Sequence, residues 1–184
     1  SITLCDHEIK VSWKNVMPFD KDNVPRPKIM GFDIEVNSTN PTAMPKAEKP
    51  GDKVFQISCV LARDGDSPDD YEKYLLTLGE PDEETVGLDT LIYMFDTEAA
   101  LLQGFTDFIR DENPNIIVGY NILGFDIPYM IARAKHNMCI FTFDRQGFHK
   151  TQHAKERTIK WSSSAYKNQE FEFLDAEGRL YVDL

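Results

Sequence analysis

The stretch that decides the fold is IIVGYNILGFDIPYMIARA, residues 116–134. It starts with a compact apolar run, typical of a buried strand, and a short polar loop follows. A helix is predicted over 126–137, because Pro128 suits a first helical turn and apolar residues recur at helical spacing. The apolar stripe is Ile127, Met130, Ile131 and Ala134. Asn121 and Asp126 therefore lie where a strand turns into a helix, an end of the sheet at which α/β proteins tend to bind ligands.

The surrounding segments predict a layered α/β domain, with a mixed sheet flanked by helices. Acidic turns separate the early strands, which indicates an antiparallel meander. After Thr97 the spacing of the apolar residues becomes helical, which predicts another helix, and Asn113–Pro114 ends it. Its stripe is Leu101, Leu102, Phe105, Phe108 and Ile109. We expect strands over 29–36, 53–62, 71–78, 91–96 (at an edge), 115–120, 170–175 and 179–184.

Charge is unevenly distributed along the 184 residues. The net charge of −11 argues against a nucleic-acid binder at face value, because phosphate affinity comes from Lys and Arg. The segment 145–167 is nevertheless basic and is predicted to form a hairpin. It interleaves cations with Phe148, Trp161 and Tyr166, as segments that grip single-stranded nucleic acid do; a solvated hairpin is the alternative. The cations are Arg145, Lys150, Lys155, Arg157, Lys160 and Lys167.

Other sequence features restrict the class of protein. Cys5, Cys59 and Cys139 are odd in number and lack zinc-site spacing, which predicts free thiols and a reducing compartment. No apolar run approaches the roughly 20 residues needed to span a bilayer, and no signal peptide is recognisable. The chain begins at Ser1 and stops within a strand-like pattern, so we expect a piece of a longer protein.

Two carboxylates lie on one face of the predicted strand 29–36. Alternation places Asp33 and Glu35 together, opposite Phe32 and Ile34. Like charges held close oppose their own ionisation, and a hard cation such as Mg²⁺ offsets this. A solvated edge strand explains the same pair, as an ordinary N-cap explains Asp126. Likewise, Asn121 suits a plain turn and Phe125 suits the core.

Taken together, these residues resemble a known family. GFDIEV at 31–36, KVFQIS at 53–58 and GYNILGFDIPYM at 119–130 are similar to the 3′→5′ exonuclease domain of family B DNA polymerases. The likeness covers roughly 26–184. It implies a ribonuclease H-like fold, with residues 1–28 forming the edge of a polymerase N-terminal domain and a connector. Residues 29–184 would then be the exonuclease domain.

The resemblance also implies site roles and partners. Asp33, Glu35 and Asp126 would bind two Mg²⁺ or Mn²⁺ ions and be catalytic, while Asn121 and Phe125 would line the groove for the 3′ end of single-stranded primer DNA. The basic hairpin would help to pass that end between active sites. Other implied partners are the rest of a DNA-directed DNA polymerase chain, a sliding clamp and accessory subunits, at no membrane. Proofreading in the nucleus, or at a viral replication site, would be the role.

One family motif is missing from this chain. The third motif, Y-x-x-x-D, supplies a fourth carboxylate. YKNQE at 166–170 has its spacing but ends in Glu170, and Asp183 resembles a family residue that is not a ligand. We therefore expect an incomplete metal site, with little nuclease activity from these residues alone. An exoribonuclease-type nuclease with the same carboxylates and a non-catalytic interaction domain are the alternatives.

Overall fold

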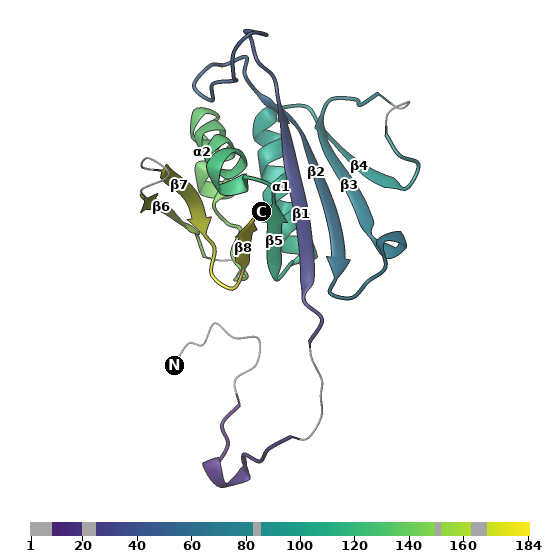
Figure 1. Ribbon diagram of the computed structural model, residues 1–184, viewed down its shortest axis with the longest axis vertical. Helices are drawn as coiled ribbons and strands as arrows, with labels where there is room; N and C mark the ends of the chain where they lie inside the picture. Colours follow the sequence, from purple (N-terminus) through teal and green to yellow (C-terminus); the bar gives the residue numbers. More distant parts are fainter. Residues whose placement is uncertain (1–8, 20–24, 83–85, 150–151, 163–168) are drawn as a thin grey trace.

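A computed structural model describes residues 9–19, 25–82, 86–149, 152–162 and 169–184. Within them, a six-stranded mixed sheet forms the centre of the molecule, in the order β4-β3-β2-β1-β5-β8 (Figure 1). Its strands are β1 (Lys28–Val36), β2 (Val54–Arg63), β3 (Glu72–Leu78), β4 (Thr90–Phe95), β5 (Ile116–Gly119) and β8 (Leu180–Asp183). This confirms the predicted α/β class.

Strand direction divides the sheet into two halves. The strands β1, β2 and β3 form the predicted antiparallel meander, and β4 closes that edge in parallel with β3. On the other side, β5 and β8 run parallel to β1. The carboxyl ends of β1, β5 and β8 therefore meet at one end of the sheet, which is the usual ligand-binding end of parallel strands.

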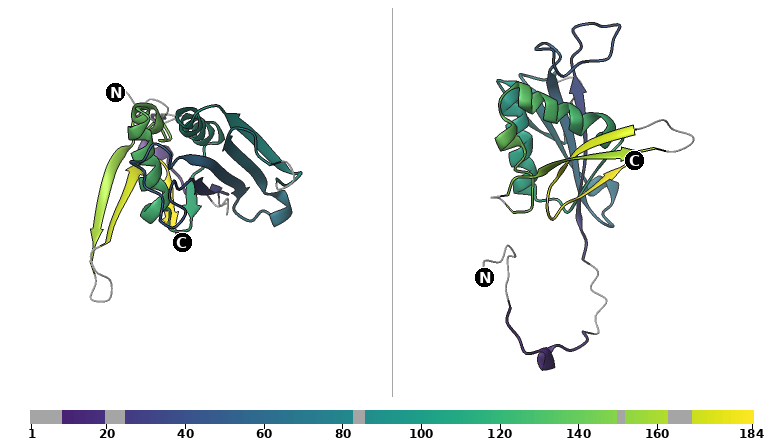
Figure 2. Two further views of the ribbon diagram at one scale, coloured as in Figure 1. Left: turned by 90° about the horizontal axis from the view of Figure 1, so that it is seen from above. Right: turned by 90° about the vertical axis from the view of Figure 1, so that its left-hand side faces the viewer.

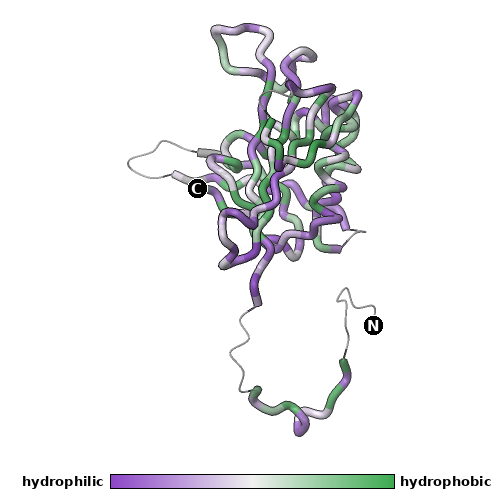
Figure 3. The backbone as a smooth tube through the Cα atoms, turned by 90° about the vertical axis from the view of Figure 1, so that its right-hand side faces the viewer, coloured by the Kyte–Doolittle hydropathy of each residue, from purple (hydrophilic) through white to green (hydrophobic). Residues whose placement is uncertain are grey.

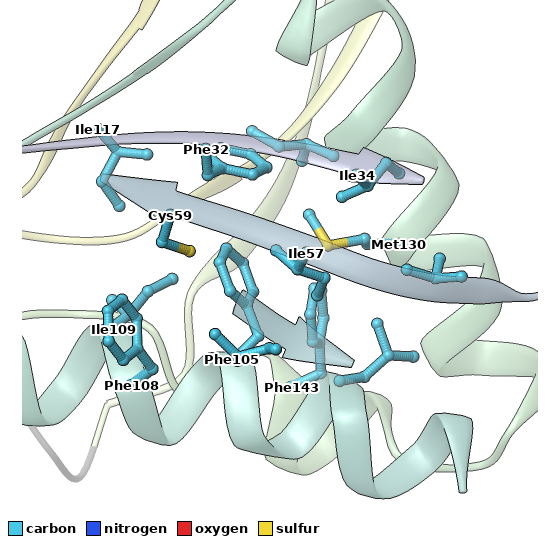
Figure 4. Close-up of a cluster of buried hydrophobic side chains, with 14 of the residues drawn as sticks. Phe32, Ile34, Ile57, Cys59, Phe105, Phe108, Ile109, Ile117, Met130 and Phe143 are labelled. Atoms are coloured by element: carbon cyan, nitrogen blue, oxygen red, sulfur yellow. The ribbon is translucent and has the colours of Figure 1, made fainter. Parts of the chain in front are cut away.

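The helix α1 (Glu98–Glu112) forms as its apolar spacing predicts. Thr97 is the N-cap, with its side chain accepting from the Ala100 N–H, and Asn113 ends the helix in the left-handed conformation at φ 50°. The predicted stripe is buried. Its Phe105 ring packs 5.3 Å from the Phe32 ring of β1. Figure 4 shows this helix facing the apolar side of the sheet across the core.

Two further helices follow β5 and pack on the same side of the sheet as α1. The helices α2 (Ile127–His136) and α3 (Ile140–Phe143) contact α1 and each other. Met130 and Phe143 join the same core (Figure 4). Figure 3 shows hydrophobic stretches gathered in the body of the domain. Among the described residues, no helix has the length and apolar character that a membrane crossing requires.

The basic segment differs from its prediction. Among its described residues, only β6 (Lys155–Trp161) is a strand, and β6 pairs with β7 (Gln169–Asp175) in a separate two-stranded hairpin. The strand that we predicted over 170–175 is thus the second arm of the hairpin, which projects from the domain (Figure 2). An acidic residue of β7 pairs with one of these cations: Arg157 donates a hydrogen bond of 3.1 Å to Asp175. Lys150, Tyr166 and Lys167 lie outside the described residues, as does Cys5.

Residues 9–19 hold a single turn of 3-10 helix, η1 (Trp13–Asn15), and all of them are exposed. A second such turn, η2 (Pro68–Asp70), connects β2 to β3. The described cysteines, Cys59 and Cys139, are free thiols, and burial raises the pKa of both.

Candidate functional site

The strand β1 presents its carboxylates as alternation predicted. Met30, Phe32 and Ile34 are buried against the helices, whereas Asp33 and Glu35 are exposed on the opposite face. In the parallel pairing Gly31 is level with Val118, so β5 ends level with Phe32 and β1 continues past it. The two carboxylates therefore lie where β1 has lost its neighbour on that side.

The predicted polar loop after β5 is instead a single turn of π-helix, η3 (Ile122–Asp126), which leads directly into α2. Such turns are rare and occur frequently at functional sites. Asn121 starts this turn in the left-handed conformation at φ 55°. Two glycines make room for it: a Cβ on Gly119 would lie 2.8 Å from the Phe32 carbonyl oxygen, and one on Gly124 would lie 2.3 Å from the Asn121 Oδ1.

Asp126 is not an ordinary N-cap. Its side chain makes no capping bond to α2 and is only 3% exposed. Instead, its Oδ1 accepts a hydrogen bond of 3.2 Å from the backbone N–H of Ile34, in the middle of the Asp33–Glu35 pair. The structure therefore brings the two sequence motifs together, although 92 residues separate the bonded groups.

Electrostatics around Asp126 favour its neutral form. Burial, reinforced by the charges of Asp33 and Asp183, raises its pKa from 3.8 to about 6, although the hydrogen bond from the Ile34 N–H acts in the opposite direction. Two or more carboxylates thus share one neighbourhood, at a cost to the ionised form. A divalent cation is a natural counter-charge for such a group.

The residues suit a divalent ion by their chemistry. Carboxylate oxygens are the ligands that Mg²⁺ and Mn²⁺ prefer, and Asp33, Glu35 and Asp126 supply them from two adjacent elements. Within the described part of the chain, however, no three His, Cys, Asp or Glu side chains are grouped closely enough to form a ready metal centre. A cation would therefore have to draw these carboxylates closer together.

Asn121 and Phe125 lie on the π-turn beside Asp126. Asn121 is exposed, and Phe125 is half-buried with its ring 5.4 Å from that of Tyr129. Tyr120, directly after β5, is 80% exposed. An amide and two aromatic rings therefore lie close to Asp126 along the chain, and such groups can bind a nucleotide base or sugar.

Sequence reasoning left Asp183 out of the site, but the structure places it under the same turn. It pairs with Gly119 across β5 and β8. Its Oδ1 accepts from the Ile122 N–H at 3.1 Å, and its Oδ2 accepts from the Leu123 N–H at 3.2 Å. The available signal in the sequence was its position near the carboxyl end of the predicted strand 179–184.

A buried ion pair on the helices was also missed. Arg133 of α2 donates to Glu98 of α1 at 2.5 and 2.7 Å, and their side chains are only 1% and 2% exposed. The remaining Arg133 nitrogen donates to the carbonyls of Ala47 and Lys49, both at 2.8 Å. This pair therefore anchors the loop 37–52, which leaves β1 directly after the carboxylates.

The mixed sheet covered by helices fits a ribonuclease H-like exonuclease domain. The family model for the exonuclease domain of family B DNA polymerases matches residues 1–184, so the chain belongs to that family.

Relatives with curated names agree with this assignment. DNA polymerase 120R of Invertebrate iridescent virus 3 is 53% identical over 90% of this chain, and DNA polymerase 037L of Invertebrate iridescent virus 6 is 41% identical over 99%. The DNA polymerase delta catalytic subunit of Dictyostelium discoideum is 32% identical over the whole chain. The chain spans only 14%, 15% and 16% of these three relatives.

Proposed function

We propose that this domain removes the 3′-terminal nucleotide of a mispaired primer, as the proofreading exonuclease of a DNA-directed DNA polymerase. The observation that carries the proposal is the hydrogen bond between Ile34 N–H and Asp126. It joins the buried carboxylate of the second motif to the strand that bears Asp33 and Glu35. Family membership and the names of the relatives support the same reaction.

Three carboxylates would hold the ions. Asp33 and Glu35 are exposed and free to turn toward a cation, whereas Asp126 is held by the backbone of β1. Bound divalent ions supply a water of lowered pKa and neutralise charge on the scissile phosphate. Two ions, Mg²⁺ or Mn²⁺, are proposed for the complete enzyme. The fourth carboxylate of the family pattern has no counterpart that we can assign in this sequence.

The flanking side chains would place the substrate. Phe125 is kept half-buried by Tyr129, so it can support the terminal base without large motion. Asn121 is exposed at the start of the turn, where its amide can donate to a sugar or phosphate oxygen. We propose both as contacts to the 3′ end of single-stranded primer DNA.

The hairpin β6–β7 would contact the primer strand as it moves between active sites. Its cations include Lys155 and Arg157, but Asp175 is paired with Arg157 and Glu156 with Lys135. Because acidic partners offset part of the charge, we propose a weak and reversible contact rather than a tight binding site.

The wider context is also a proposal. Residues 1–28 would connect this domain to the rest of the polymerase chain, since the described residues 9–19 are all exposed. A sliding clamp and accessory subunits would be further partners. The named relatives come from viruses and from a eukaryote, so we propose the nucleus or a viral replication site.

Substitution of the central carboxylate tests the function. In the full-length polymerase, Asp126→Asn keeps an oxygen for the Ile34 N–H but removes the charge. We expect excision of a mismatched primer to fall at least about a hundredfold, as when a charged group at a reacting centre is lost. Polymerisation should continue. Asp111→Asn, an exposed change on α1, is the control.

The same assay separates the alternatives. Normal excision by Asp126→Asn would contradict the proposed site. If wild-type polymerase lacked Mg²⁺-dependent excision altogether, the domain would be a non-catalytic interaction module. A strong preference for RNA over DNA ends would favour the exoribonuclease alternative.

A further inference from the structure

The π-turn η3 is held from outside by Asp183. Both oxygens of its carboxylate accept hydrogen bonds, from the first two N–H groups of the turn, at 3.1 and 3.2 Å. These N–H groups have no partner within a helix, because they lie at its N-terminal end. A carboxylate is the acceptor best suited to that end.

The usual local cap is missing at this position. Asn121 occupies the N-cap position, but it is left-handed and its side chain makes no capping bond. Asp183 takes over that role from β8, 60 residues further along the chain than Leu123. The pairing of β8 with β5 sets its place, since Asp183 is level with Gly119 and Leu184 N–H donates to the Gly119 carbonyl at 3.0 Å.

The turn is therefore fixed at both ends. Asp183 binds its first two N–H groups, and Asp126, its last residue, accepts from Ile34 of β1. The start of the turn is also closely packed against β5, since a Cβ on Gly119 would lie 2.3 Å from the Ile122 Cγ2. A shift of the first anchor would consequently move the last residue of the turn.

We propose that Asp183 is a positioning residue of the exonuclease site: by capping η3 from β8, it sets where Asp126 and Phe125 stand relative to Asp33. This inference rests on the proposed function for the role of Asp126. It differs from that function because it assigns Asp183 to the turn and not to the cation or the substrate.

Hydrogen exchange tests the contact independently of catalysis. In full-length polymerase, deuterium uptake is followed by mass spectrometry in a peptide covering 120–126. With Asp183→Ala we expect exchange of the Ile122 and Leu123 amides to accelerate at least about tenfold, the effect of losing a hydrogen bond to a charged acceptor. Asp33→Asn, which also removes a charge near Asp126, should leave this uptake unchanged.

Kinetics then show whether the contact serves the site. For Asp183→Ala we expect kcat for excision of single-stranded DNA to fall at least about tenfold with KM nearly constant, as when only transition-state interactions are lost. The half-saturating Mn²⁺ concentration for excision should rise, whereas that for polymerisation should not. Asp111→Ala, an exposed change on α1, is the control for loss of an aspartate.

Each outcome decides the inference. Faster exchange together with lower kcat supports it. Lost excision with unchanged exchange would overturn it and make Asp183 a direct ligand. Faster exchange with normal excision would also overturn it and leave Asp183 a stabilising contact only. If Asp33→Asn itself excises normally while exchange responds to Asp183→Ala, the proposed function fails but the contact stands.

Discussion

The Arg133–Glu98 pair gives the sharpest stability prediction, because it lies inside the domain. Arg133→Met removes four hydrogen bonds, two to Glu98 and two to the carbonyls of Ala47 and Lys49. Burial opposes ionisation of Glu98, but bonds from Arg133, Asn137 and the Val54 N–H outweigh it and lower its pKa. Without Arg133, the Glu98 carboxylate stays buried and keeps only the hydrogen bonds from Asn137 and the Val54 N–H.

The expected cost follows from this geometry. Removing one partner of a buried pair costs about 3–5 kcal/mol in free energy of unfolding. For a chain of this size each kcal/mol shifts Tm by about 2–4 °C, so the loss should be roughly 6–20 °C. Urea and thermal unfolding followed by circular dichroism, on the 184-residue chain, measure both quantities.

A matched control lies two positions further along α2. Lys135 pairs with Glu156 at 2.7 Å, but both side chains are about half exposed, at 50% and 46%. Lys135→Met should therefore cost less than about 1 kcal/mol. The double variant Glu98→Met with Arg133→Met should recover much of the loss, since it leaves no unpaired charge. If Arg133→Met and Lys135→Met proved equally mild, the reasoning about this pair would be refuted.

Three further predictions concern the pH response, the loop and the hairpin. The pKa of Asp126 is raised from 3.8 to about 6. Its contribution to stability is thus full below pH 4 and is lost as pH rises through about 6. In EDTA, the free energy of unfolding of Asp126→Asn should rise relative to that of wild type as pH increases through this range. Parallel plots of that free energy against pH for the two proteins would contradict this. Hydrogen bonds from the Thr39 side chain and from the N–H groups of Lys46 and Thr39 lower the pKa of Asp52 to about 2. Asp52→Ala should therefore speed tryptic cleavage in the loop 37–52, and an unchanged rate would dismiss Asp52 as its anchor. Neutralising the cations of β6 in the full polymerase should slow primer transfer between active sites without slowing excision of single strands, and unchanged partitioning would count against the hairpin contact. Those cations are Lys155, Arg157 and Lys160.

Local periodicity was enough to predict the main elements. Alternation along β1 correctly separated Phe32 and Ile34 from Asp33 and Glu35. The stripe of α1 is buried as expected. These predictions succeed because apolar side chains at period 2 or 3.6 have only one way to reach a common core.

The features that the sequence did not predict depend on contacts between residues that are distant in sequence. A π-turn differs from a loop by hydrogen bonds that no apolar period encodes, so η3 was predicted as irregular. Arg133 in a helix sequence suggests an exposed cation, and its burial is explained by distant partners: Glu98, 35 residues away, and the carbonyls of the loop 37–52. Asp183 was set aside because it resembles a family residue that is not a ligand, and its acceptor role becomes visible only when β8 pairs with β5.

The central claim is that Asp33, Glu35 and Asp126 bind divalent ions at one place. Anomalous diffraction from crystals of the full-length polymerase soaked in Mn²⁺ tests it most directly. We predict manganese peaks about 2.1 Å from oxygens of Asp126 and of the β1 carboxylates, in the distance range of hard octahedral cations. Ordered manganese elsewhere in the enzyme, with none between β1 and η3, would contradict the claim.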